Sequence, residues 1–164
     1  MIKIRFIPIF EDDEFIDAVN EYTQIWDAEG TKILDVFKKI TNLSFIENRI
    51  AVVVYEGISF SGRTPNDVMK LRASYDADTK KGTLIHELSH RLLFNIKNRV
   101  EEDEHKTIYL FLFDVWVELY GEDFAKKMVQ IEMNRGENYM SAWNYALSLT
   151  NTQRSDKFLS LCNS

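Results

Sequence analysis

Two of the three histidines in the chain, His86 and His90, are four residues apart, and Glu87 directly follows the first of them. On an α-helix, residues four apart lie about 40° apart around the axis and one turn apart along it. The two imidazoles can therefore bind one metal ion, whereas Glu87, about 100° from His86, is placed to reach a water molecule on that metal. The spacing predicts a metal-dependent hydrolase in which Glu87 takes the proton of the attacking water.

Imidazole nitrogens are ligands that zinc prefers, and a catalytic zinc site has three protein ligands and a fourth position open for water. Manganese, cobalt and iron also accept such ligands and remain alternatives. We therefore expect Zn²⁺ as the cofactor and a third protein ligand elsewhere in the chain.

The residues around the two histidines follow a helical pattern. Apolar side chains fall on the face opposite to His86 and His90, and these are Leu84, Ile85, Leu88 and Leu92. This pattern predicts a helix with its apolar back in the core and its histidines lining a cleft. The alternative is an amphipathic helix with two solvent-facing histidines and no metal, because so short a motif also occurs by chance.

The segment Thr83–Leu93 resembles the motif of the zincin superfamily of metallopeptidases. In that superfamily the two histidines bind zinc and the glutamate is the general base, so the resemblance implies these roles for His86, His90 and Glu87. It also implies a peptide or protein substrate. The order of strands, motif helix and further helices resembles compact zincins of SprT-like or minigluzincin-like layout.

In zincins an edge strand that precedes the motif helix binds the substrate backbone by strand addition. Met69–Tyr75 occupies this place in the chain, and its side chains alternate between apolar and polar as in a half-buried strand. The resemblance therefore implies that Arg72 and Ser74, on the polar face of this segment, bind substrate.

The third ligand differs among zincins. Metzincins take it from a histidine just beyond the motif, after a glycine, but residues 91–96 contain neither, so that subgroup is excluded. His105 is the remaining histidine, and it begins an expected helix on the same face as Leu112 and Trp116. This resembles the SprT-like arrangement, in which a later helix begins with the third histidine. We therefore predict that His86, His90 and His105 bind the metal.

Asp114 is the main rival to His105. It lies in a stretch that is apolar nearly all round, where a carboxylate must be paired or it becomes protonated. It could be a ligand itself or accept a hydrogen bond from a ligand histidine. Because Asp114 and His105 lie about 180° apart on the helix, the two do not touch the same ion. Weaker ligand candidates are Glu101, Glu102, Glu104 and Glu118, and candidates for stabilising the oxyanion are Arg72, Tyr109, Tyr120 and Tyr139.

The pattern of apolar and polar residues along the rest of the chain predicts the strands and helices that carry these candidate residues. We expect strands at 2–9, 50–55 and 69–75, a helix from residue 11 that Gly30 breaks, and a second helix to residue 40. The segment Asp76–Thr79 is expected to end the last strand and to offer a cap for the motif helix. The later helices are expected near 80–96, 104–120, 122–133, 138–150 and 152–161, with a polar connection at 95–102.

This layout predicts an α+β, zincin-like fold. A small mixed β-sheet with helices comes first, followed by the active-site helix and an α-helical C-terminal half. We expect one metallopeptidase domain over residues 1–164, with an α/β half at 1–78 and a helical half at 79–164.

The composition of the chain limits the classes of molecule that it is expected to bind. The chain has 164 residues, is 45% hydrophobic and carries a net charge of −6, so it has a sufficient core and no overall attraction to nucleic acid or anionic membrane. We expect no leader segment and no membrane span, and the single cysteine, Cys162, is typical of a reducing compartment. We therefore expect a cytoplasmic protein. The alternative function is a zincin-fold binding or regulatory protein without proteolytic activity, although such a protein would need no Glu87. Nothing indicates the oligomeric state.

Overall fold

The structure is a computed structural model that describes residues 2–96 and 104–162. The chain groups into two compact units. The first contains Met1–Leu34 and Phe45–Asn95, and the second contains Asp35–Ser44 and Ile96–Ser164. The motif helix therefore belongs to the unit that also contains the sheet, and each unit is described in turn.

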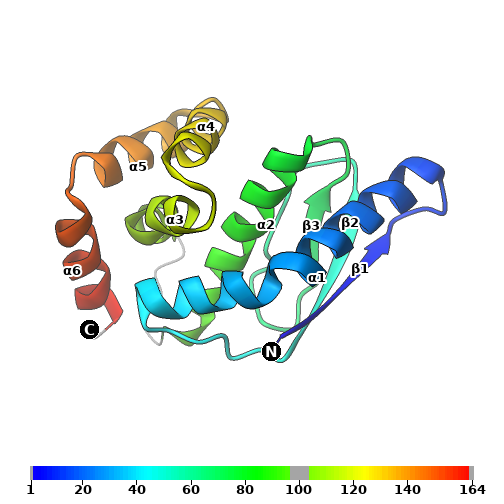
Figure 1. Ribbon diagram of the computed structural model, residues 1–164, viewed down its shortest axis with the longest axis horizontal. Coiled ribbons are helices and arrows are strands. Elements are labelled where there is room, and N and C mark those ends of the chain that lie inside the picture. Colours follow the sequence, from blue (N-terminus) through cyan, green and yellow to red (C-terminus); the bar gives the residue numbers. More distant parts are fainter. Residues whose placement is uncertain (1, 97–103, 163–164) are drawn as a thin grey trace. The chain divides into compact units, whose positions relative to one another are not determined.

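The first unit is built on a three-stranded sheet in the order β1-β2-β3, with β1 at Lys3–Pro8, β2 at Arg49–Tyr55 and β3 at Met69–Arg72 (Figure 1). The three expected strands are confirmed, and the last ends at Arg72 rather than Tyr75. The expectation of a mixed sheet is wrong for these strands, because both ladders are parallel. Among the described residues the antiparallel pairing is one isolated bridge between Phe60 and Lys70.

Helix α1, at Asp13–Thr41, connects β1 to β2 and runs without a break through Gly30. The prediction that Gly30 ends this helix is wrong, and packing explains why. A Cβ atom at Gly30 would lie 2.9 Å from two ring atoms of Trp26. Gly30 therefore lets the buried Trp26 ring lie flat across the helix, and its absence of a side chain serves this close approach rather than a turn.

Helix α2, at Ala77–Leu92, carries the motif and continues into a short 3₁₀ turn, η1, at Leu93–Asn95. The cap expected within Asp76–Thr79 is confirmed, and its capping residue is Asp76, whose carboxylate accepts a hydrogen bond of 2.7 Å from the backbone N–H of Thr79. Lys80 and Lys81 form ion pairs with Glu21 and Glu29 of α1. These pairs hold α2 alongside α1.

The second unit is helical. It contains α3 at Glu104–Tyr120, α4 at Glu122–Met133, α5 at Glu137–Leu147 and α6 at Asn151–Cys162, together with the last turns of α1. All four helices confirm the expected pattern within a few residues, and the part of the predicted polar connection at 97–102 lies outside the described residues. Gly121 and Gly136, with φ of 89° and 151°, precede α4 and α5. The core of this unit contains Phe111, Trp116, Trp143 and Phe158.

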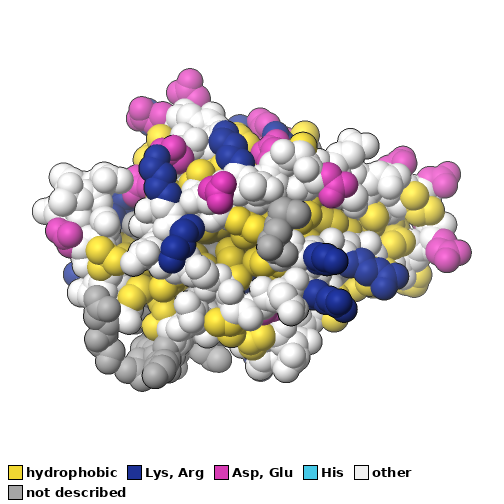
Figure 2. Space-filling view, turned by 60° about the horizontal axis from the view of Figure 1, so that its bottom comes forward, with side chains coloured by type: hydrophobic (Ala, Val, Ile, Leu, Met, Phe, Trp, Pro, Cys, Tyr) yellow, Lys and Arg dark blue, Asp and Glu magenta, His cyan; other side chains and the backbone are white. Residues whose placement is uncertain are grey.

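Among the described residues, no helix is both long and apolar enough to cross a membrane. Hydrophobic side chains nevertheless reach the surface, as Figure 2 shows for one face of the molecule. Ile58 and Phe10 are the most exposed large hydrophobic residues.

Candidate metal centre

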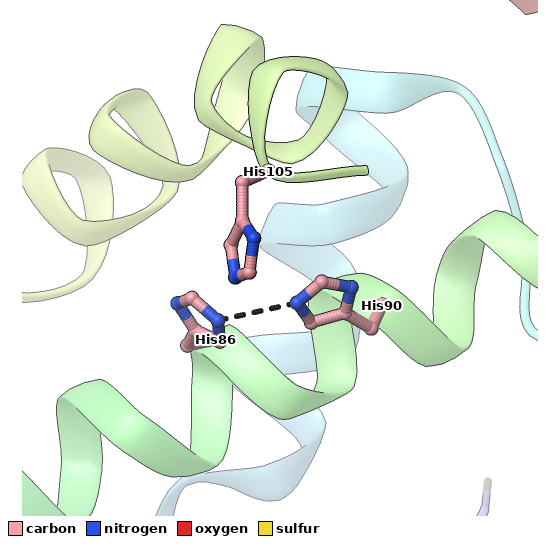
Figure 3. A group of neighbouring side chains, drawn as sticks. All are labelled: His86, His90 and His105. Atoms are coloured by element: carbon pink, nitrogen blue, oxygen red, sulfur yellow. Dashed lines mark hydrogen bonds between the residues drawn. The ribbon is translucent and has the colours of Figure 1, made fainter. Parts of the chain in front are cut away.

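His86 and His90 lie one turn apart on α2, as predicted, and both are buried, with 2% and 7% of their surface exposed. Their Nε2 atoms are 3.2 Å apart, and Figure 3 shows the two rings turned toward each other. The apolar back of the helix explains this placement, since Leu84, Ile85, Leu88 and Leu92 are all fully buried. Burial of that face leaves the two imidazoles side by side on the other face.

Glu87 is also buried, with 4% of its surface exposed. Burial raises the pKa of Tyr22 well above its usual value, and electrostatic interactions with Tyr75 and Glu87 raise it further. Burial likewise raises the pKa of Tyr55, and here the charge of Glu87 is the next cause. The Glu87 carboxylate therefore acts electrostatically on tyrosines of α1 and β2 within the first unit.

His105 lies in the first turn of α3. One ligand nitrogen from each of His86, His90 and His105 lies within 4.8 Å of those of the other two, and Figure 3 shows the three rings facing a common point. The structure thus brings together the three histidines that the sequence predicts as metal ligands.

The donor set and its spacing fit zinc. Two nitrogen ligands of a tetrahedral zinc ion, each about 2.0–2.1 Å from the metal, are separated by about 3.3 Å. The His86 and His90 Nε2 atoms are 3.2 Å apart, close to that separation. A hydrogen bond between two neutral imidazoles also gives this distance. The argument for a metal site therefore depends on the third histidine, His105.

Asp114 has a different partner from the one that the sequence suggests. Its carboxylate accepts hydrogen bonds of 3.0 Å from Nε and 2.6 Å from Nη2 of Arg154, on α6. It is not part of the histidine group. The prediction that a buried carboxylate here must be paired is therefore confirmed, but its role as a ligand or as a partner of a ligand histidine is replaced by an ion pair within the second unit.

The remaining ligand candidates are placed as follows. Glu101 and Glu102 lie outside the described residues. Glu104 is half-buried at the start of α3, and Glu118 forms an exposed ion pair of 2.8 Å with Lys39. Neither of these two described carboxylates belongs to the histidine group.

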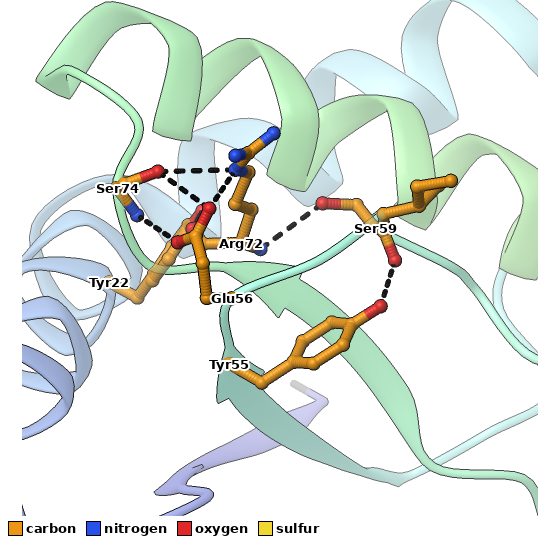
Figure 4. A network of polar contacts seen from close by, with 7 residues as sticks. Tyr22, Tyr55, Glu56, Ser59, Arg72 and Ser74 are labelled. Atoms are coloured by element: carbon orange, nitrogen blue, oxygen red, sulfur yellow. Dashed lines mark hydrogen bonds and ion pairs between the residues drawn. The ribbon is translucent and has the colours of Figure 1, made fainter.

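Arg72 and Ser74, the predicted substrate-binding residues, are joined to Glu56 in a polar network (Figure 4). The Glu56 carboxylate accepts hydrogen bonds from the Nε atom of Arg72 and from the hydroxyl and backbone N–H of Ser74. Burial tends to raise the pKa of Glu56, but the hydrogen bonds from Ser74 and Arg72 outweigh it and lower that pKa below its usual value.

The outer edge of β3 is already covered by the chain itself. Lys70 exchanges two backbone hydrogen bonds, of 2.8 and 2.9 Å, with Phe60. The Arg72 N–H donates to the Ser59 hydroxyl, and the Arg72 carbonyl accepts from the Tyr22 hydroxyl. A peptide therefore cannot add to β3 at Lys70 and Arg72 as the resemblance implies, because Phe60 and Ser59 already occupy the hydrogen-bonding positions there.

The tyrosines proposed as oxyanion stabilisers differ in their surroundings. Tyr109 is fully buried and stacks on Trp143, with ring centroids 3.8 Å apart. Tyr120 packs against Phe124 at 4.5 Å, whereas Tyr139 packs against His105, also at 4.5 Å. Of the three, Tyr139 is thus both half-buried and next to a predicted ligand.

Sequence reasoning missed the role of Arg91. This side chain is fully buried one residue after His90, where it donates to the carbonyls of Thr64 and Asp67 at 3.0 and 2.6 Å. It also lies 3.2 Å from the Glu47 carboxylate. Arg91 therefore connects the segment between β2 and β3 to the end of the motif helix. The sequence around it could not show this, because a buried arginine in a helix has the same sequence pattern as a solvent-exposed arginine.

Comparison of the chain with protein-family models, curated proteins and solved structures found no match.

Proposed function

We propose that the chain is a zinc-dependent peptidase in which His86, His90 and His105 bind the metal and Glu87 is the general base. The observation that carries the proposal is the grouping of three histidine nitrogens within 4.8 Å, with Glu87 adjacent to one of them on the motif helix. Three neutral imidazoles suit a catalytic zinc site, since they leave one position for water.

Zinc bound at these residues would lower the pKa of a water molecule and polarise the substrate carbonyl. Glu87 accepts a proton from the attacking water at its carboxylate and then donates it to the amine nitrogen that leaves. The packing of α2 fixes the direction of the His86 and His90 side chains. The buried surroundings of Glu87 strengthen its electrostatic interactions relative to those in water.

The substrate in this proposal lies along the 59–61 segment as an added strand. Support comes from the bridge between Phe60 and Lys70, which makes this segment antiparallel to β3, and from the Phe60 side chain, which is 44% exposed. The Tyr55 hydroxyl also donates to the Ile58 carbonyl and holds the beginning of the segment against β2.

The decisive experiment combines metal content with hydrolysis of a peptide library. The wild-type protein is expected to hold about one zinc per chain. His86→Ala and His105→Ala should each lose the metal, while Glu87→Gln should keep it and lose hydrolysis.

The pattern of outcomes separates the alternatives. Zinc retained in His105→Ala would remove this residue from the ligand set. Hydrolysis retained in Glu87→Gln would overturn its role as the base. Zinc binding without hydrolysis of any peptide in the wild type would favour a binding or regulatory protein. Folding of each variant is checked by circular dichroism.

A further inference from the structure

His105 packs against two tyrosine rings of the second unit. Tyr109, one turn further along α3, has its ring centroid 5.5 Å from that of His105, and Tyr139, on α5, lies 4.5 Å from it. The planes are tilted by 49° and 50°. We call these two rings the aromatic bracket, and its two members approach His105 from different helices.

The Tyr109 side of the bracket is rigid. Its ring is fully buried and nearly parallel to Trp143, at 3.8 Å and 12°. The indole N–H of Trp143 donates a 2.9 Å hydrogen bond to Glu132, a carboxylate that is buried on α4. Trp143 also stacks on Trp116 at 5.7 Å. Tyr109 is therefore held by a packed column that ends in a buried, hydrogen-bonded carboxylate.

The Tyr139 side depends on the turn between α4 and α5. Gly136 has a φ of 151° and accepts the first hydrogen bond of α5 from Met140 at 3.1 Å. The Arg135 guanidinium lies 6.0 Å from the centre of the Tyr139 ring. Tyr139 lies in the first turn of α5, directly after this glycine, and its half-buried ring packs against His105.

We propose that Tyr139, together with Tyr109, is a positioning residue that holds the His105 imidazole in its metal-binding rotamer. The inference rests on the proposed function, because it assigns the bracket to the predicted third ligand. A histidine side chain rotates about two bonds, and packing against two aromatic rings restricts this rotation before any metal binds. A ligand that is ordered in advance loses less conformational entropy on binding, so metal affinity increases.

The test is a titration with Zn²⁺ and with Co²⁺, whose visible absorption reports coordination geometry. Tyr139→Ala should weaken zinc binding about tenfold, as for other groups that orient a metal ligand. Tyr139→Phe keeps the ring and should bind zinc as the wild type does. Tyr120→Ala is the matched control, because it removes a ring of the same unit that packs on Phe124 instead of His105.

A second measurement needs no metal. In the metal-free protein, NMR relaxation of the His105 ring carbons reports its motion, and Tyr139→Ala should lower the order parameter while Tyr120→Ala should not. Equal zinc affinities and equal ring order in the wild type and Tyr139→Ala would overturn the inference, as would equal losses in both alanine variants. Ordered His105 in a wild type that binds no zinc would overturn the proposed function and leave the bracket as packing alone.

Discussion

The pairing of Asp114 with Arg154 leads to a prediction that separates a structural carboxylate from a metal ligand. We consider Asp114→Asn, which keeps the shape of the side chain and removes its charge. The Arg154 side chain is 7% exposed and that of Asp114 is 16% exposed, so solvent screens their two hydrogen bonds weakly. Arg154 also donates to the Leu149 carbonyl at 2.8 Å, and it cannot turn to solvent without losing that bond.

The magnitude follows from this geometry. Removing one partner of a buried ion pair costs about 3–5 kcal/mol, because the other charge stays buried. The amide introduced by the substitution would still offer one acceptor oxygen to Arg154, so what is lost is chiefly one charge-assisted hydrogen bond, about 1.5–3 kcal/mol. We therefore expect Asp114→Asn to lower the free energy of unfolding of the second unit by about 2 kcal/mol. Zinc content should not change.

The assay is urea unfolding followed by tryptophan fluorescence, since Trp116 and Trp143 both lie in the second unit. Zinc content is measured on the same samples. Glu118→Gln is the control, because its ion pair with Lys39 on the surface of the same unit is worth no more than about 1 kcal/mol. Zinc lost from Asp114→Asn with unchanged stability would refute the reasoning and return Asp114 to the metal site.

Two further predictions concern the first unit. Gly30→Ala should lower the unfolding temperature, because the new methyl group would lie 2.9 Å from the Trp26 ring. Overpacking of this kind costs about 1–3 kcal/mol, which outweighs the gain of up to about 1 kcal/mol in helix propensity. A higher unfolding temperature in the variant would contradict this reasoning. Glu56 has a lowered pKa in the folded protein, so its ionised form stabilises the fold above the unfolded-state pKa and this stabilisation is lost as pH falls through the folded-state value. The difference in urea midpoint between the wild type and Glu56→Gln should therefore shrink between about pH 7 and about pH 3, and a constant difference would exclude the effect.

Much of the local structure could be predicted from the sequence because it depends on neighbouring residues. Helical spacing places His86 and His90 on one face, Asp76 caps the helix that carries them, and continuous β-branched residues form the central strand β2. The start of α3 at the predicted third ligand, His105, also follows from the apolar pattern beyond it. These features need only periodicity and capping, which act over a few residues.

Three features required the tertiary structure because their partners are distant in sequence. Asp114 pairs with a guanidinium forty residues away, so its chain neighbours could show that it needed a partner and not which one. The edge of β3 is covered by Phe60 and Ser59, whose segment has no strand pattern of its own.

The grouping of His105 with the two motif histidines is likewise a matter of tertiary structure. The sequence contains three histidines, whose imidazole nitrogens are suitable ligands for zinc. The spacing of His86 and His90 predicts that these two lie one helical turn apart. The third is separated from them by residues 91–104, and a connection of that length does not by itself bring two side chains together. The folded chain alone shows that nitrogen atoms of all three lie within 4.8 Å of one another, because residues that are far apart in sequence approach each other only through tertiary structure.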